Sequence, residues 1–242
     1  MRIRKLASLI PLSLVLAAGP ALAQHNVDKV FGGITAKAGQ TYGSLESVNG
    51  GITIREGATV RSAETVNGGI SIDDKARVGS AESVNGGISL GEEATAGSIE
   101  AVNGGISLAR GAVVERDVET VNGSIKAEAE AKIGGNAENV NGAISLVGAE
   151  VGGGITTTNG DIVLARGAIV RGGLLIEKPQ GGWWNTTDNR KPRVVIGANS
   201  VVEGSLVFER EVELFVHPTA KIGTVTGATA QSFTDSLPPR ED

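Results

Sequence analysis

Aliphatic residues recur along this chain at intervals of six. An α-helix would bring apolar residues back after three and four positions, and no long stretch after residue 23 does so. A strand of three or four residues plus a bend fills six positions, so the interval predicts short strands joined by bends. The aliphatic series before the first slip in the interval is Val48, Ile54, Val60, Val66, Ile72, Val78, Val84, Leu90, Ala96, Val102, Leu108 and Val114.

A longer repeat contains three of these intervals. Val-Asn-Gly begins at positions 48, 66, 84, 102, 121 and 140 and returns as Thr158-Asn159-Gly160, with spacings of 18, 18, 18, 19, 19 and 18. Val30 begins a degenerate first copy. Eighteen residues in three short strands make one coil of a solenoid. The sequence therefore predicts an all-β, single-domain parallel β-helix of about nine coils over residues 24–231. A series of β-hairpins with Asn-Gly turns is the alternative, but the segments are short and the period is regular for it.

Each coil is expected to bury about five small aliphatic side chains. In the second coil these would be Val48, Ile52, Ile54, Ala58 and Val60. Such burial is worth about 1–3 kcal/mol per side chain, whereas ordering the backbone costs about 1–2 kcal/mol per residue. A lone coil should thus be unfolded, and stability must come from pairing with neighbouring coils. The Asn-Gly-Gly segments are expected at corners, where Asn and Gly reach positive φ most easily.

Two ladders follow from the repeat, because equivalent residues of successive coils lie about 4.8 Å apart. Stacked carboxamides can hydrogen-bond along the axis, which indicates a structural ladder. Stacked carboxylates repel, so the glutamates should either extend into solvent at a corner, accept turn amides, or form a weak metal-binding ridge. The asparagine ladder comprises Asn49, Asn67, Asn85, Asn103, Asn122, Asn141 and Asn159, and the glutamate ladder Glu46, Glu64, Glu82, Glu100, Glu119 and Glu138.

The repeat is interrupted once, at about residues 177–193. This stretch has the composition of a loop and contains Trp183 and Trp184. The two indoles are candidates for contact with a glycan or another partner, or for a lid folded back on the solenoid flank. The interval of six then returns and ends before residues 232–242, which should be a disordered tail. Phe31 and the segment after Thr226 are candidate caps of the two solenoid ends.

The first 23 residues have the pattern of a signal peptide. Three basic residues precede an apolar stretch, and Ala21-Leu22-Ala23 matches a signal-peptidase site. The stretch is shorter than the ~20 residues needed to cross a bilayer, and no later segment is apolar for that length. We expect an exported chain, periplasmic or on the cell surface, with no transmembrane segment after cleavage.

Charge and composition exclude several classes of function. The first 23 residues carry three of the 22 basic residues and none of the 27 acidic ones, so the remainder has a net charge of −8. A chain this acidic lacks the basic surface that nucleic acid requires. There is no cysteine, which removes disulfides and thiolate metal sites, and no cofactor is expected. The 36 glycines and seven aromatic residues indicate a thin core with many turns.

No catalytic constellation is visible. Hexapeptide-repeat acyltransferases use a histidine base, and here only His25 and His217 exist, near the two ends of the repeat. Lyases gather acidic groups on one face, whereas the pairs Asp73-Asp74 and Glu92-Glu93 and the single Asp161 are expected at different coil positions. Ice binding would favour a threonine column, but the matching column is Thr53, Ser71, Ser89, Ser107, Lys126 and Ser145.

Two family resemblances attach to the repeat. The segment from Val194 to Leu206, Val-Val-Ile-Gly-Ala-Asn-Ser-Val-Val-Glu-Gly-Ser-Leu, resembles the repeats of bactofilins, polymer-forming cytoskeletal β-helix proteins. The Val-Asn-Gly-Gly-Ile copies resemble exported bacterial β-helix domains of the adhesin type. The resemblance spans about residues 28–227 and implies a right-handed helix. The signal peptide sets this chain apart from bactofilins, which act in the cytoplasm.

These observations predict a non-enzymatic structural or adhesin-like scaffold of the envelope or cell surface. It would be a monomer or a weak end-to-end oligomer, in contact with other copies or with envelope polysaccharide or protein. A polysaccharide- or cation-binding β-helix is the alternative, and a lyase-like enzyme comes last.

Overall fold

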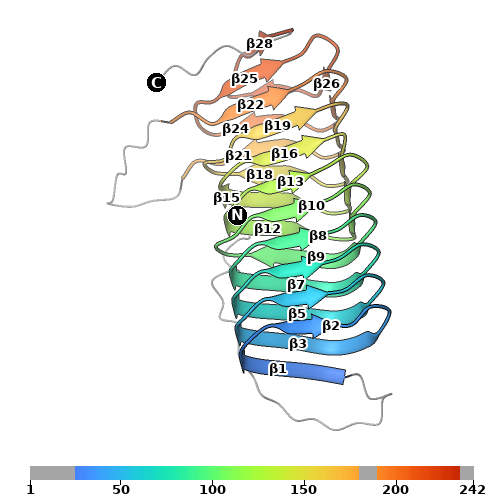
Figure 1. The fold of residues 1–242 in the computed structure, drawn as a ribbon. Helices are drawn as coiled ribbons and strands as arrows, with labels where there is room; N and C mark the ends of the chain where they lie inside the picture. The colour runs from blue at the N-terminus through green and yellow to red at the C-terminus, as the bar shows by residue number, and fades with distance from the viewer. Residues whose placement is uncertain (1–24, 180–189, 235–242) are drawn as a thin grey trace, which may run out of the picture.

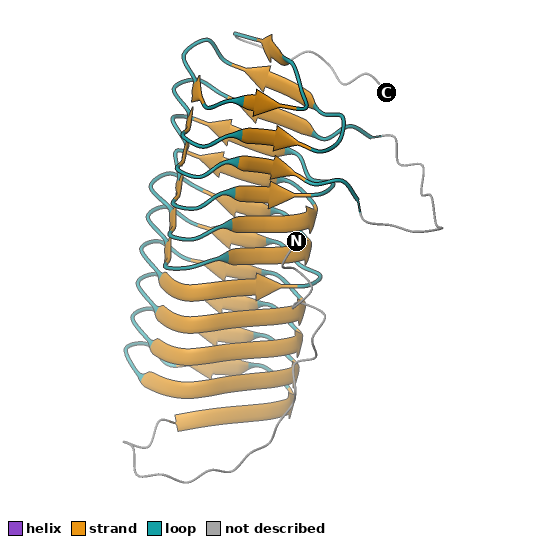
Figure 2. Ribbon diagram, turned by 180° about the vertical axis from the view of Figure 1, so that it is seen from behind, coloured by secondary structure: helices purple, strands orange, loops and turns teal. Residues whose placement is uncertain are grey.

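The structure, a computed structural model, describes residues 25–179 and 190–234. These residues contain no helix, and every strand pairs in parallel with the equivalent strand of a neighbouring coil. Figure 1 shows the coils stacked in one column from β1 at one end to β28 at the other, and Figure 2 shows the same column from behind. The predicted parallel β-helix is confirmed.

Each coil contributes strands to three faces, which we number in the order in which the chain crosses them within one coil. The third face is an eleven-stranded sheet in which each strand lies one coil from the next. It consists of β2 (Ile34–Ala36), β4 (Ile52–Ile54), β6 (Ile70–Ile72), β8 (Ile88–Leu90), β10 (Ile106–Leu108), β13 (Ile125–Ala127), β16 (Ile144–Val147), β19 (Ile162–Ala165), β22 (Arg193–Ile196), β25 (Glu213–Val216) and β28 (Ala230–Ser232).

The first and second faces join into one bent sheet of seventeen strands. In the early coils a single long strand crosses both faces: β1 (His25–Phe31), β3 (Thr41–Asn49), β5 (Thr59–Asn67), β7 (Arg77–Asn85) and β9 (Thr95–Ala101). In later coils the first face holds β11 (Val113–Val114), β14 (Lys132–Ile133), β17 (Glu150–Val151), β20 (Ile169–Val170), β23 (Val201–Val202) and β26 (Lys221–Ile222). The second face holds β12 (Val118–Asn122), β15 (Ala137–Asn141), β18 (Ile155–Thr157), β21 (Leu174–Ile176), β24 (Leu206–Phe208) and β27 (Val225–Thr226).

The number of strands per coil changes where the spacing of the repeat changes. Two residues, Arg61 and Ser62, separate the inward Val60 and Ala63 in an early coil. Three residues separate Val114 from Val118, because the coil is one residue longer there, and the long strand divides into β11 and β12. The prediction of three strands per coil thus describes the later coils, whereas the early coils have two.

There are about eleven coils rather than nine, as the eleven strands of the third face show. The count from sequence was too low because coils after Ile176 lack the Val-Asn-Gly marker. They are recognised only by inward aliphatic residues such as Ile196, Val202 and Leu206, all buried.

The valine of Val-Asn-Gly does not point into the core, which corrects the expected core set. Leu45 and Ser47 are buried, whereas Val48 is only partly buried on the outer surface. Strand alternation explains this: Leu45 faces inward, so Ser47 does as well, and Glu46 and Val48 face outward. Ile52, Ile54, Ala58 and Val60 are buried as predicted.

The glycines at the Asn-Gly-Gly corner serve close packing rather than positive φ. Gly50, Gly68, Gly86 and Gly104 have no positive φ. A Cβ placed on any of them would collide with the carbonyl of the equivalent glycine in the coil below. At this corner Gly32 and Gly142 do have positive φ. Positive φ recurs more regularly at the turn between the third and first faces, at residues such as Gly57, Lys75, Glu93, Gly111 and Glu130.

Strands border both the insertion and the C-terminal segment. The insertion lies between β21 and β22, so Arg193 belongs to a strand, and Trp183 and Trp184 lie outside the described residues. Ser232 belongs to β28 rather than to the tail, and Phe233 packs edge-on against His217 at 5.7 Å between ring centroids. The predicted signal peptide and residues 235–242 lie outside the described residues. Within the described ranges, no helix is long and apolar enough to span a membrane.

Candidate functional site

The seven asparagines form one continuous hydrogen-bonded chain along the column. Each Nδ2 donates to the Oδ1 of the asparagine one coil below, and all six bonds measure 2.9–3.0 Å. Parallel pairing in register places the side chains over one another, as Asn49 with Asn67 and Asn67 with Asn85. The carboxamides therefore stabilise the stack along its axis, which is the structural role predicted for them.

Both ends of this ladder are satisfied by other groups. At the lower end Asn49 Nδ2 donates to the Val30 carbonyl at 3.3 Å. At the upper end Arg210 Nη1 donates to Asn159 Oδ1 at 2.6 Å. Aligned amide dipoles leave a partial negative charge at the oxygen end, and a guanidinium there is favourable for the same reason as a cation at a helix C-terminus.

A second polar ladder lies inside the solenoid. The residue before the valine of the repeat is buried, and in most coils its side chain donates to a glycine carbonyl of the coil below. Ala101 has no such group, and Thr157 Oγ1 accepts from the Gly160 amide. Thr65 Oγ1 donates to Gly50 O at 2.9 Å and Thr120 Oγ1 to Gly104 O at 2.9 Å. The same column contains Ser47, Thr65, Ser83, Ala101, Thr120, Asn139 and Thr157. Sequence reasoning missed it, although the regular small polar residue before Val-Asn-Gly was a usable signal.

The glutamate ladder lies in the middle of the strands of the second face, not at a corner. Glu46, Glu64, Glu82, Glu100, Glu119 and Glu138 are direct neighbours from coil to coil, with Asp28 below and Thr156 above. All six are partly buried between the valine column and the first face. The expectation that they extend into solvent at a corner is therefore wrong.

The pKa values of several of these carboxyl groups are raised, first by burial and then by the neighbouring carboxylates. Burial raises the pKa of Glu119 to about 7, and the charges of Glu100, Glu138 and Asp117 add to the shift. Burial is also the largest cause for Glu46, Glu82 and Glu138, whose pKa values are raised as well. Within the described ranges, no three His, Cys, Asp or Glu side chains group in a way that could hold a metal ion.

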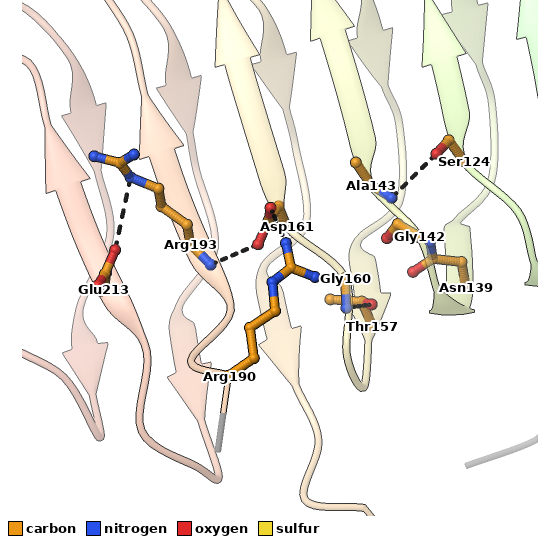
Figure 3. Close-up of polar contacts among 10 residues, drawn as sticks. All are labelled: Ser124, Asn139, Gly142, Ala143, Thr157, Gly160, Asp161, Arg190, Arg193 and Glu213. Atoms are coloured by element: carbon orange, nitrogen blue, oxygen red, sulfur yellow. Dashed lines mark hydrogen bonds and ion pairs between the residues drawn. The ribbon is translucent and has the colours of Figure 1, made fainter. Parts of the chain in front are cut away.

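A cluster of charged residues fastens the end of the insertion to the column (Figure 3). Asp161, immediately before β19, accepts from Arg190 Nη2 at 2.8 Å and from the Arg193 backbone amide at 2.9 Å. Arg210 also donates to the Arg190 carbonyl at 3.1 Å. Arg193 lies 4.7 Å from the Phe215 ring centroid and 3.7 Å from Glu213. Asp161 thus has a structural role in holding the returning chain.

The other acidic candidates are closer together than predicted. Asp73-Asp74 and Glu92-Glu93 occupy the same turn in adjacent coils, where Asp74 Oδ1 accepts the Glu92 amide at 2.8 Å. Asp73 and Asp74 border an open hollow of about 460 Å³ on the flank. His25 and His217 lie at opposite ends of the column, in β1 and after β25 (Figure 1).

The column that begins with Thr53 is also in register on the third face. Thr53, Ser71, Ser89, Ser107, Lys126 and Ser145 follow one another from β4 to β16, and Thr35 continues the column below. The outer surface therefore presents lines of similar residues along its length: glutamate, valine, asparagine, and serine or threonine interrupted by Lys126.

These features define a β-solenoid with ordered outer columns and polar ladders along its axis. Comparisons of the chain with protein-family models, with curated proteins and with solved structures gave no match.

Proposed function

We propose that this chain is a non-enzymatic scaffold of the bacterial envelope or cell surface, exported by residues 1–23. The observation that carries the proposal is the unbroken stack of coils. Equivalent outward-facing residues of successive coils lie over one another along most of the column. A column of this kind offers a partner many equivalent contacts at a fixed spacing, which favours avidity over a single deep site.

The placement of the candidate chemical groups supports a structural role over catalysis. The two histidines are separated by the length of the column, and Asp161 is used to hold the insertion. The asparagine ladder, the most regular polar feature, is bonded to itself and at both ends to the protein. The likeness of the repeat to bactofilins and adhesin-type domains is a further reason for the proposal.

The ends of the column favour a monomer or a weak end-to-end oligomer. Among the described strands, β1 pairs only with β3 and β28 only with β25, so each end has a free strand edge. Val30 and Phe31 of β1 are 60% and 79% exposed and add apolar surface to that end. Phe31 therefore does not cover the core as a cap. Lys29 faces inward in line with Ser47, so close stacking of a second copy would bury an ammonium group.

Cell fractionation and negative-stain microscopy of the purified protein test this function. We expect the protein in the envelope fraction, and single rods or short end-to-end chains in the micrographs. Light scattering over a concentration series should give a mass that rises little with concentration. A cytoplasmic location, an obligate globular trimer, or turnover of pectin, alginate or peptidoglycan would contradict the proposal.

A further inference from the structure

The residue types at the inward-facing positions of the solenoid change at the β1 end. His25, Val27 and Lys29 stand in register with Tyr42, Leu45 and Ser47 of the next coil, all three of which are buried. In the coils above, the corresponding positions hold side chains that fill the interior. At this end the same positions carry an imidazole and an ammonium group, and no described strand lies below them.

The opening at this end contains a hollow of about 350 Å³. Its floor is apolar and consists of Ile34, the ring of Tyr42 and the partly buried Val27. The volume is at the lower end of the range of small-molecule sites, which combine an apolar lining with a few oriented polar groups.

The rim of the hollow is cationic. Lys29 and Lys37 both line it, together with His25, whose ring packs edge-on against Tyr42 at 5.8 Å between centroids. Lys29 Nζ donates to the Gly33 carbonyl at 2.9 Å, and an ammonium group has three donors, so it can serve a second acceptor.

The local charge is opposite in sign to that of the whole chain. Asp28 is the only acidic residue between positions 25 and 45, whereas the chain carries a net charge of −5. Asp28 belongs to the outward-facing glutamate column, next to Glu46, and does not line the hollow. The two lysines of the rim are therefore not neutralised from within it.

We propose that the β1 end of the solenoid is a binding site for a small organic carboxylate with an apolar body. The carboxylate would accept from the ammonium groups of the rim, Lys29 and Lys37, and the apolar part would cover Ile34, Val27 and the Tyr42 ring. Binding satisfies the cations through charge-assisted hydrogen bonds and covers the apolar floor of the open end.

N-acetyl-leucine and its uncharged amide are matched probes for this site, because they differ only in the carboxylate. Each is titrated into the isotopically labelled full chain and followed by two-dimensional amide NMR. The acid is expected to give saturable shifts at Ile34, Thr41 and Tyr42. The amide is expected to bind at least about tenfold more weakly, as the loss of a charge-assisted bond predicts.

Two variants complete the test. The double variant Lys29→Gln/Lys37→Gln should bind the acid at least about tenfold more weakly while keeping its thermal midpoint. Lys75→Gln, in the turn after β6, removes a cation outside the hollow and should bind like the parent. Equal shifts from acid and amide, no saturation, or undiminished binding by the double variant would overturn the proposal.

Discussion

At the scale of single residues, the polar side chains of this protein are arranged by coil position and serve the stack. Asparagine side chains on the outer surface and hydroxyl groups in the interior both form hydrogen bonds from one coil to the next. The buried hydroxyls of this ladder are tolerated where they donate to a glycine carbonyl of the coil below, as those of Ser47, Thr65, Ser83 and Thr120 do.

Substitution of an asparagine inside the ladder should be costly for an exposed position. Asn103→Ala removes the bonds to Asn85 and from Asn122, and we expect a loss of about 1–3 kcal/mol in unfolding free energy. Urea denaturation followed by circular dichroism measures it. Ser107→Ala, on the exposed surface of the same coil, is the control and should change stability by less than about 0.5 kcal/mol. Equal effects would show that the ladder adds nothing.

The interior hydroxyl ladder makes a paired prediction. Thr120→Val removes the bond to Gly104 O at nearly constant volume and should destabilise the protein by about 1–3 kcal/mol. Ala101 stands in the same column without a hydroxyl, so Ala101→Ser should be neutral or stabilising by up to about 1 kcal/mol. If Ala101→Ser destabilises the protein as much as Thr120→Val does, the hydroxyl ladder does not stabilise the stack. Thermal and urea unfolding of both variants provide the comparison.

The glutamate column makes stability depend on pH. Because the pKa of Glu119 is about 7 in the folded chain and near 4.5 when unfolded, the folded state binds more protons between these values. The contribution of Glu119 to the unfolding free energy should therefore be greatest below about pH 4.5, and it should be lost as the pH rises to about 7. Glu119→Gln should flatten the decline between pH 5 and 7. Urea midpoints that rise over this interval would contradict the assignment.

At the scale of elements, the corner between the second and third faces depends on close approach of backbones. Gly86→Ala places a methyl group against the Gly68 carbonyl, so β7 and β5 must separate locally. We expect a loss of about 3 kcal/mol, as for overpacking. Gly111→Ala is the matched control: its φ is +67°, but a Cβ meets nothing closer than 3.7 Å, and it should cost only about 1 kcal/mol. The opposite ranking in urea unfolding would overturn this interpretation.

At the scale of the whole molecule, stability should behave as a sum over neighbouring coils. Deleting residues 68–85 removes one 18-residue coil and joins Asn67 to Gly86 in unchanged register. We expect a folded column, one coil shorter, with a thermal midpoint within about 5 °C of the parent. Deleting only residues 77–85 breaks the register, and we expect loss of cooperative unfolding. Circular dichroism melts compare the two, and similar behaviour would contradict independent stacking of coils.

Much of the fold was predictable from sequence because the same residue types recur at a regular interval. The spacing of Val-Asn-Gly defines which residues become axial neighbours, so the asparagine and glutamate ladders follow from counting. The direction of a side chain does not follow from the period: Val48 and Ser47 differ by one position, and strand alternation from Leu45 places the serine inside. The late coils were undercounted because they lack the marker, although their buried aliphatic residues remain.

The sequence by itself determined the parallel stack, the register between coils and the identity of both outer ladders, because an axial repeat converts sequence distance directly into spatial neighbourhood. Only the tertiary structure decided which side of each strand faces the core, that the corner glycines serve backbone contact, and that Arg210 reaches back 51 residues to the end of the asparagine ladder. Those features depend on where chains from different coils meet in space, and no local pattern encodes such a meeting.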